Sequence, residues 1–200
     1  MSHQKEILRI LKGLKGSGRF VSYGTTDFIL PGLRINKERE VPFPISPDQI
    51  DQIIRHAHQA PYGKGSETLV DKSVRNTWEV DSAGLTFDNP AWNEMLKQVI
   101  GAVKDDLGIS RNKVRAELHK LLLYEEGGHF ARHKDTEKGK DMFGSLIIYL
   151  PSKYTGGELV VDFEQEEAVI DFSENSPYKL GYAAFYSDCD HEIKPVRSGT

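Results

Sequence analysis

In the first half of the chain, apolar residues recur every three or four positions in three segments, which is the spacing of one buried helix face. The segments span residues 4–14, 46–60 and 89–107. Ser46 and Asn89 stand where an N-terminal cap is expected, and each is followed by a proline suited to the first turn. Three helices are therefore predicted. Short strands are expected between them at residues 20–23, 28–30 and 76–80.

After residue 115 the pattern changes to short apolar runs bounded by glycine, proline and polar residues, which is typical of β-strands. Strands are expected at residues 116–124, 145–150, 158–163, 168–172 and 180–186, with a last strand that starts at residue 191 and that the chain barely enters. Such spacing favours a sandwich or barrel. We predict an α+β fold in one domain over residues 1–200, in which residues 1–115 give helical and β support. Residues 116–200 would form the β core, with its C-terminal strand truncated.

Composition and charge exclude several classes of partner. The 200 residues carry a net charge of −4, which leaves no basic footprint for nucleic acid. No apolar run approaches the length of a membrane span, and the first residues lack the apolar segment of a signal peptide. The single cysteine, Cys189, fits a reducing compartment. We therefore expect a cytoplasmic or nuclear protein that does not enter membranes, and the sequence gives no indication of its oligomeric state.

Two imidazoles and one carboxylate in the second half form a candidate metal site. His133 and Asp135 are two positions apart, so that in an extended backbone both side chains point to one face. His191 lies at the end of a predicted strand, and the 56 residues after Asp135 leave room for the strands that would return it to the first pair. Two histidines and one carboxylate on one face of an octahedron favour Fe(II) with open positions opposite.

Other metal sites receive less support from the same region. His129 and His133 are four apart, as in helical zinc sites, but Phe130 stands where the general base would follow the first histidine. The glycines at 127 and 128 also oppose a helix. His56 and His58 fall on the second predicted helix, where residues two apart face different ways, so we expect a solvated face there. The thiolate of Cys189 remains open either as a metal ligand or as a small filler beside His191.

Three ordered segments resemble motifs of the prolyl 4-hydroxylase-like Fe(II)/2-oxoglutarate dioxygenases. Residues 124–135 (YEEGGHFARHKD) resemble the first iron-binding motif, residues 154–159 (YTGGEL) the Gly-Gly-Glu turn, and residues 191–199 (HEIKPVRSG) the distal-histidine motif. Together these segments lie within residues 116–200. Three motifs in order at suitable separations are more specific than a single His-x-Asp.

The resemblance implies a double-stranded β-helix, or jelly roll, that holds Fe(II) with His133, Asp135 and His191. It also implies 2-oxoglutarate as co-substrate, O₂, and ascorbate as an additional reductant. The implied reaction hydroxylates a C–H bond, by default of a protein side chain such as proline, with succinate and CO₂ as co-products. The alternatives are an inactive metal-binding jelly roll used for interaction, or an oxygenase acting on a small molecule or a nucleobase.

The resemblance also suggests which residues contact 2-oxoglutarate. Tyr124 and Tyr149 look like tyrosines that hydrogen-bond the co-substrate in family members. The family anchors the far carboxylate on an arginine or lysine nine or ten positions after the distal histidine, and the ninth position here is Thr200. Arg197, six positions after His191, is the candidate substitute, because a guanidinium can bind a carboxylate with two hydrogen bonds. Residues 61–75 and 136–143 are polar and are expected to be loops that act as lids.

Overall fold

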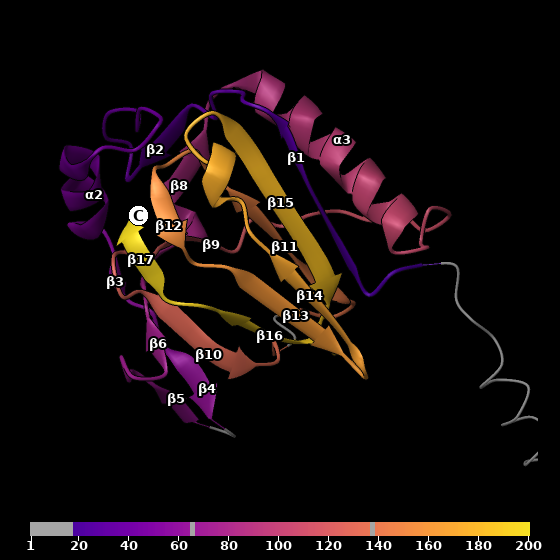
Figure 1. Cartoon of the computed structure of the whole chain (residues 1–200). Helices are drawn as coiled ribbons and strands as arrows, with labels where there is room; N and C mark the ends of the chain where they lie inside the picture. The colour runs from indigo at the N-terminus through magenta and orange to yellow at the C-terminus, as the bar shows by residue number, and fades with distance from the viewer. Residues whose placement is uncertain (1–17, 65–66, 137–138) are drawn as a thin grey trace, which may run out of the picture.

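The computed structural model describes residues 18–64, 67–136 and 139–200, and two antiparallel sheets dominate it (Figure 1). The larger sheet has five strands in the order β14-β13-β16-β10-β6, and the other has three in the order β1-β15-β11. Their bounds are Val21–Asp27 (β1), Arg75–Asn76 (β6), His129–His133 (β10), Gly144–Tyr149 (β11), Leu159–Phe163 (β13), Glu166–Ile170 (β14), Lys179–Tyr186 (β15) and Asp190–Ile193 (β16). The helix predicted at residues 4–14 lies outside the described residues.

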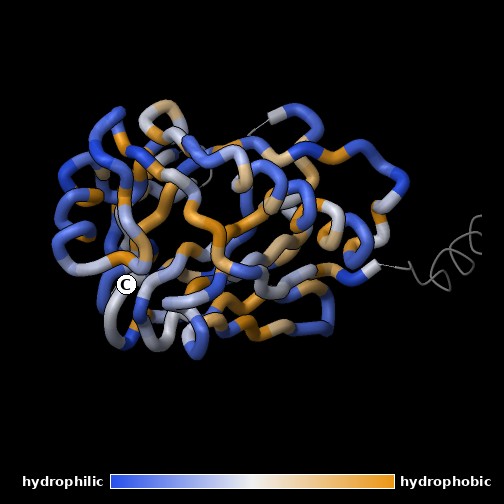
Figure 2. Tube along the Cα trace, turned by 90° about the horizontal axis from the view of Figure 1, so that it is seen from above, coloured by the Kyte–Doolittle hydropathy of each residue, from blue (hydrophilic) through white to orange (hydrophobic). Residues whose placement is uncertain are grey.

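The two sheets share one hydrophobic core. A buried cluster combines Val21 of β1 and Phe185 of β15 with Leu159 and Val161 of β13. Alternate residues of facing strands interdigitate in this way when sheets pack face to face. In Figure 2 many of the hydrophobic stretches run through the interior of the trace, and mostly hydrophilic segments lie around its outline. The second half of the chain is therefore β-rich, as its pattern predicted.

Among the residues that the structure describes, two α-helices accompany the sheets. Helix α3 (Pro90–Asp106) is capped by the Asn89 side chain, which accepts from Ala91 N at 3.0 Å. Its buried residues, which include Trp92 and Val99, belong to a cluster with Leu180 and Ala184 of β15. Helix α3 therefore covers the three-stranded sheet, as Figure 1 also shows.

Helix α2 (Pro47–Ile54) begins where it was predicted, with the Gln49 side chain accepting from Ser46 N at 2.8 Å. The prediction that it continues to residue 60 is wrong. Residues His58–Gln59 form β3 instead, which pairs with β7 (Trp78–Asp81), so a tertiary strand pairing replaces the last helical turns. His56 and His58 therefore do not lie on one helix.

Several short elements were not predicted. Residues 61–75 are not a plain loop, because β4 (Tyr62–Lys64) and β5 (Glu67–Leu69) form a hairpin there. Residues 28–30, predicted as a strand, have no regular structure. The further elements that were not predicted are β2 (Leu33–Ile35), η1 (Ser82–Gly84), β8 (Leu85–Phe87), β12 (Tyr154–Gly156), η2 (Ser173–Asn175) and β17 (Val196–Gly199). The strand predicted at residues 116–124 is confirmed as the shorter β9 (Lys120–Leu123). β2 pairs with β8, β9 with β7, and β12 with β17.

In the part of the chain that the structure describes, neither helix is long and apolar enough to cross a membrane.

Candidate metal centre

The register between β10 and β16 brings the two candidate histidines together. His133 and His191 are direct partners across these antiparallel strands, and their ring centroids are 4.2 Å apart. A register shift lies between Phe130 and His133, so the last residue of β10 is offset from the regular ladder. On its other side His191 pairs with Val161 of β13, which places it inside the five-stranded sheet.

Asp135 completes the group from the segment that follows β10. Its Oδ1 atom lies 3.9 Å from His133 Nε2 and 3.7 Å from His191 Nε2. One ligand atom from each of the three residues falls within 4.8 Å of the others. The side chain of His191 is 5% exposed and that of Asp135 29%, so the group is buried on one side and accessible on the other. The structure therefore brings together the three residues proposed from the sequence.

In both imidazoles Nε2 is the nitrogen that is available to bind a metal ion. His133 Nδ1 lies 2.8 Å from Ala131 O, and His191 Nδ1 lies 3.4 Å from Cys189 O. A carbonyl only accepts hydrogen bonds, so each Nδ1 carries the proton and each Nε2 keeps a free lone pair toward Asp135. Burial and the charge of His191 lower the pKa of His133 to about 4. Burial also lowers the pKa of His191, so both rings are neutral near pH 7.

Three neighbours contact these ligands, and the sequence did not indicate their roles. Ser145, at the start of β11, donates a hydrogen bond from its hydroxyl to Asp135 Oδ2, which leaves Oδ1 facing the histidines. Phe130 stacks on His133 with centroids 3.5 Å apart, and Phe185 packs at 4.5 Å from His191. A serine that opens an apolar strand was the available signal for the first contact.

The glycine motifs hold the backbone that follows His191. Gly127 N donates to Val196 O at 2.8 Å, and Val196 N donates to Gly128 O at 2.9 Å. From the other side, Gly157 N donates to Pro195 O at 3.2 Å. The three segments that resemble family motifs therefore meet in space, and the two glycine pairs fix the segment just after β16.

Tyr124 lies close enough to the group to interact with it. Burial raises the pKa of its hydroxyl, while the charge of Arg75 and hydrogen bonds with Thr77 and Arg75 act in the opposite direction. The Asp135 carboxylate also raises this pKa, which places Tyr124 within electrostatic range of the triad. Arg75 and Thr77 come from the first half of the chain, where the sequence showed no motif.

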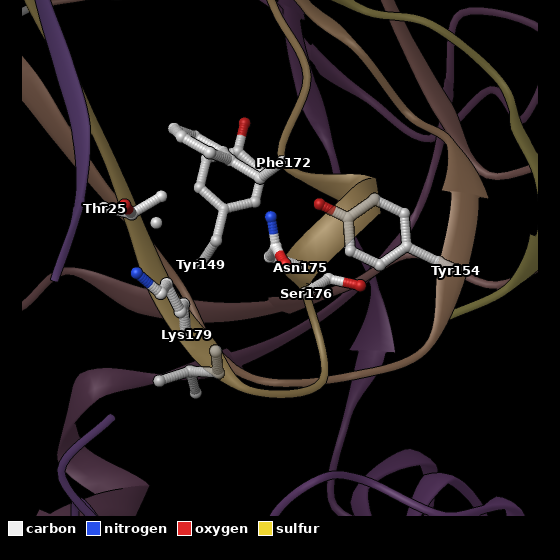
Figure 3. Close-up of a pocket in the computed structure, with 9 residues that line it drawn as sticks. Thr25, Tyr149, Tyr154, Phe172, Asn175, Ser176 and Lys179 are labelled. Atoms are coloured by element: carbon white, nitrogen blue, oxygen red, sulfur yellow. The ribbon is translucent and has the colours of Figure 1, made fainter. Parts of the chain in front are cut away.

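Tyr149 lies in a small pocket together with Tyr154, Phe172 and Lys179 (Figure 3). Its ring packs against Phe172 with centroids 4.9 Å apart. Its hydroxyl is buried and has no hydrogen-bond partner among the described residues, which is an uncommon state for a buried polar group. The pocket thus contains a hydroxyl whose hydrogen-bonding capacity the described residues do not satisfy.

Arg197 lies outside the pocket that contains Tyr149. Its Nη2 atom binds Glu158 Oε1 at 2.8 Å, and its side chain is 68% exposed. It is not one of the residues that line the pocket around Tyr149. In this structure Tyr149 and Arg197 therefore do not share a pocket.

The alternative ligands do not join the group. His129 and His133 lie on a strand and not on a helix, which contradicts a helical zinc site. His129 instead lies 3.1 Å from Ser73 O through Nε2. The buried thiol of Cys189 points to Phe20 O at 3.8 Å, as expected of a small filler. His56 and His58 are not merely solvated, since their Nε2 atoms lie 3.1 Å from Glu38 and 3.2 Å from Glu79.

Comparisons with known proteins point to one family. Residues 119–200 match the sequence model of the 2OG-Fe(II) oxygenase superfamily. An uncharacterized protein of fowlpox virus (strain NVSL) is 32% identical over 92 residues, which are 44% of this chain and 22% of that protein. The chain thus spans only about a fifth of that relative's length.

Solved structures show a similar fold at low sequence identity. A prolyl hydroxylase from Trichoplax adhaerens, in complex with a peptide fragment of the hypoxia inducible factor oxygen degradation domain, is 16% identical with a TM-score of 0.50, over 84% of this chain and 80% of that one. A prolyl-4-hydroxylase from Pseudomonas putida is 15% identical with a TM-score of 0.46, over 76% of each chain. A 2OG-Fe(II) oxygenase family oxidoreductase from Burkholderia pseudomallei is 18% identical with a TM-score of 0.39, over 76% and 72%.

The recognition made from the sequence is confirmed to this extent: residues 119–200 match the model of the 2OG-Fe(II) oxygenase superfamily, and this match implies Fe(II), 2-oxoglutarate and O₂ as cofactors.

Proposed function

We propose that this chain is an Fe(II)- and 2-oxoglutarate-dependent dioxygenase that hydroxylates a C–H bond of a protein side chain, with succinate and CO₂ as co-products. The observation that carries the proposal is the convergence of His133 Nε2, His191 Nε2 and Asp135 Oδ1. This donor set fits the metal, because two neutral imidazoles and one carboxylate suit Fe(II) and leave positions open for further ligands. A double-stranded β-helix in one domain would account for the two packed sheets.

The chain's own residues have separate tasks in this proposal. His133, Asp135 and His191 hold the ion, and Ser145 fixes which oxygen of Asp135 faces it. The site keeps a net charge of 1+ with Fe(II), which favours an anionic co-substrate. Bound there, Fe(II) with 2-oxoglutarate and O₂ supplies the oxidising equivalents for hydroxylation.

Three residues are proposed to bind 2-oxoglutarate. The buried, unpartnered hydroxyl of Tyr149 is a donor for a carboxylate, and Tyr124 supplies a second hydroxyl close to Asp135. Arg197 is proposed as the cationic contact, but it would first have to leave Glu158. Because an exposed ion pair of this kind contributes little free energy, that exchange is energetically accessible.

A protein substrate, with proline as the default, is proposed from the similarity to the Trichoplax adhaerens enzyme, whose structure contains a peptide. The net charge of −4 favours this class over a nucleobase in nucleic acid. Incubation with proline-containing peptides, nucleobases and small metabolites, followed by mass spectrometry for one added oxygen atom, would distinguish the classes. Ascorbate would be included as reductant in each reaction.

The enzyme proposal is tested by Fe(II)-dependent release of succinate from 2-oxoglutarate. We expect release by the wild-type chain and by His56→Ala, a matched control whose imidazole pairs with Glu38. We expect none from Asp135→Ala, which loses the anionic ligand. If the wild-type chain binds iron through the triad but releases no succinate, the chain is an inactive metal-binding module. If His133→Ala keeps full metal binding, the metal centre itself is wrong.

A further inference from the structure

A buried arginine next to the candidate metal centre has no role in the proposal so far. Arg75 belongs to β6, at the edge of the five-stranded sheet, and pairs with Phe130 of β10. Its side chain is only 9% exposed. Arginine is seldom this buried unless it is paired, so its contacts indicate what it does.

On its outer side Arg75 is held by a buried carboxylate and a carbonyl. Its Nη2 atom lies 3.7 Å from Glu79 Oε2, and the Glu79 side chain is 4% exposed. Its Nη1 atom donates to Pro61 O at 2.5 Å, just before the β4–β5 hairpin. Glu79 is itself fixed by Lys120 Nζ at 2.6 Å. These contacts compensate the buried charge and fix the guanidinium in place.

On the side facing the triad, Arg75 contacts the ring of Phe130. The guanidinium carbon lies 4.4 Å from the centroid of the Phe130 ring, within the range of a cation–π contact. Phe130 in turn stacks on His133, with centroids 3.5 Å apart. The charge of Arg75 also lowers the pKa of the Tyr124 hydroxyl, which places the two side chains within electrostatic range of each other. One planar side chain therefore supports the ring that lies behind a ligand histidine.

We infer that Arg75 is a positioning residue of the metal centre, which holds the Phe130 ring against His133. The inference rests on the proposed metal centre. A guanidinium suits this task because its flat face can cover a ring while its edge donates to several acceptors, and an ammonium cannot do both. The ion pair between Glu79 and Lys120 holds the Glu79 carboxylate in place, and Glu79 in turn holds the Arg75 guanidinium.

The inference is tested by binding of Co(II) to the metal-free full chain, which needs no turnover. The Arg75→Met variant keeps an unbranched side chain but loses the N–H donors and the positive charge of the guanidinium. We expect an affinity weaker by about tenfold, at the lower end of the effects typical of residues that support metal ligands. We also expect an altered Co(II) absorption spectrum, because the orientation of His133 changes. Arg75→Lys should recover less than half of the affinity.

Arg34→Met is the matched control, because Arg34 pairs with Asp88 at 2.6 Å outside the site. We expect it to bind Co(II) with wild-type affinity and spectrum. If Arg75→Met lowers the melting temperature but leaves the affinity and spectrum of the folded protein unchanged, Arg75 is only a structural ion-pair residue and the inference is overturned.

A second comparison keeps the test decisive if Arg75→Met does not fold. Phe130→Leu removes the ring through which Arg75 would act, and Arg75→Lys in that background should then have less effect on Co(II) affinity than it has alone. Additive effects would contradict the inference. Failure of the metal centre would be distinguishable, since Asp135→Ala would then bind Co(II) like the wild-type chain.

Discussion

His133 and His191, 58 positions apart in the chain, are direct cross-strand partners in β10 and β16, with ring centroids 4.2 Å apart. A slip of one residue in this pairing would turn one imidazole to the opposite face of the sheet. The candidate metal centre therefore depends on the register of the five-stranded sheet as well as on the identity of three side chains. Residues that fix this register, or the orientation of the carboxylate, are the best points at which to test it.

Ser145→Ala should weaken metal binding without unfolding the protein. The serine hydroxyl donates to Asp135 Oδ2, and without it the carboxylate is free to rotate away from the two Nε2 atoms. Loss of such a supporting hydrogen bond typically costs about 10- to 100-fold in metal affinity. Calorimetric titration with Mn(II) or Co(II) would measure the loss of metal affinity. Ser198→Ala, which removes a hydroxyl paired with Thr155 on the surface, is the control and should bind metal normally.

Gly156→Ala should destabilise the protein more than Gly127→Ala. Both glycines have positive φ, 75° and 76°, so an alanine costs about 1–2 kcal/mol at either position. At Gly156 the added Cβ would also lie 2.6 Å from Pro195 O, whereas at Gly127 nothing lies within 4 Å. The clash falls on the segment just after the strand that carries His191. Urea unfolding would compare the free energies of unfolding of the two variants. Equal losses of stability would show that the structure around Gly156 relaxes the clash at no cost in free energy.

The sequence predicted what depends on local pattern and on spacing along the chain. The strands of the second half, the caps at Ser46 and Asn89, and the grouping of His133 with Asp135 and His191 are of this kind. It did not predict where α2 ends, because a pairing between β3 and β7 decides that end. Helical spacing cannot reveal a competing strand partner located 20 residues further along the chain.

The supporting residues of the site were missed for a related reason. Arg75 and Thr77 reach Tyr124 only because β6 and β7 are placed beside the core by tertiary packing. Ser145 contacts Asp135 from ten positions further along the chain, and no motif in the sequence links the two residues. The polar composition of residues 61–75 indicated a loop, although β4 and β5 pair within it. Contacts of this type depend on the three-dimensional arrangement and leave little trace in one sequence.

The metal-free protein should lose stability as the pH falls from about 6.5 toward about 4. Burial, followed by the charge of His191, lowers the pKa of His133 to about 4, below the value of about 6.5 expected in the unfolded chain. Between these values the unfolded state binds a proton that the folded state does not, so the free energy of unfolding decreases as the pH decreases. For His133 alone the slope is at most about 1.4 kcal/mol per pH unit.

Urea unfolding of chelator-treated protein at about pH 5.5 and pH 7 would measure this dependence. Burial lowers the pKa of His191 as well, so it contributes in the same direction. His133→Gln should therefore reduce the dependence but not abolish it. The same dependence in His133→Gln as in the wild-type chain would show that His133 is not protonated differently in the two states.

Tyr149→Phe should leave the protein as stable as the wild type, or slightly more stable, and should weaken 2-oxoglutarate binding. The hydroxyl is buried without a partner among the described residues, so its removal loses no hydrogen bond in the unliganded protein and relieves the cost of desolvation. If the hydroxyl binds the co-substrate carboxylate, its loss should raise the dissociation constant about tenfold, or about 1.4 kcal/mol. Thermal unfolding would measure the stability, and anaerobic calorimetry with Mn(II)-loaded protein would measure the dissociation constant for 2-oxoglutarate.

Arg197→Ala provides the comparison for the same assay. Arg197 is 68% exposed and bound to Glu158, so it must exchange partners before it can contact 2-oxoglutarate, and its net contribution to binding is correspondingly smaller. We therefore expect a smaller increase in the dissociation constant for Arg197→Ala than for Tyr149→Phe. The reverse order would mean that Arg197 moves to the co-substrate on binding and that it is the principal carboxylate anchor. No change in either variant would place the carboxylate outside the pocket that contains Tyr149.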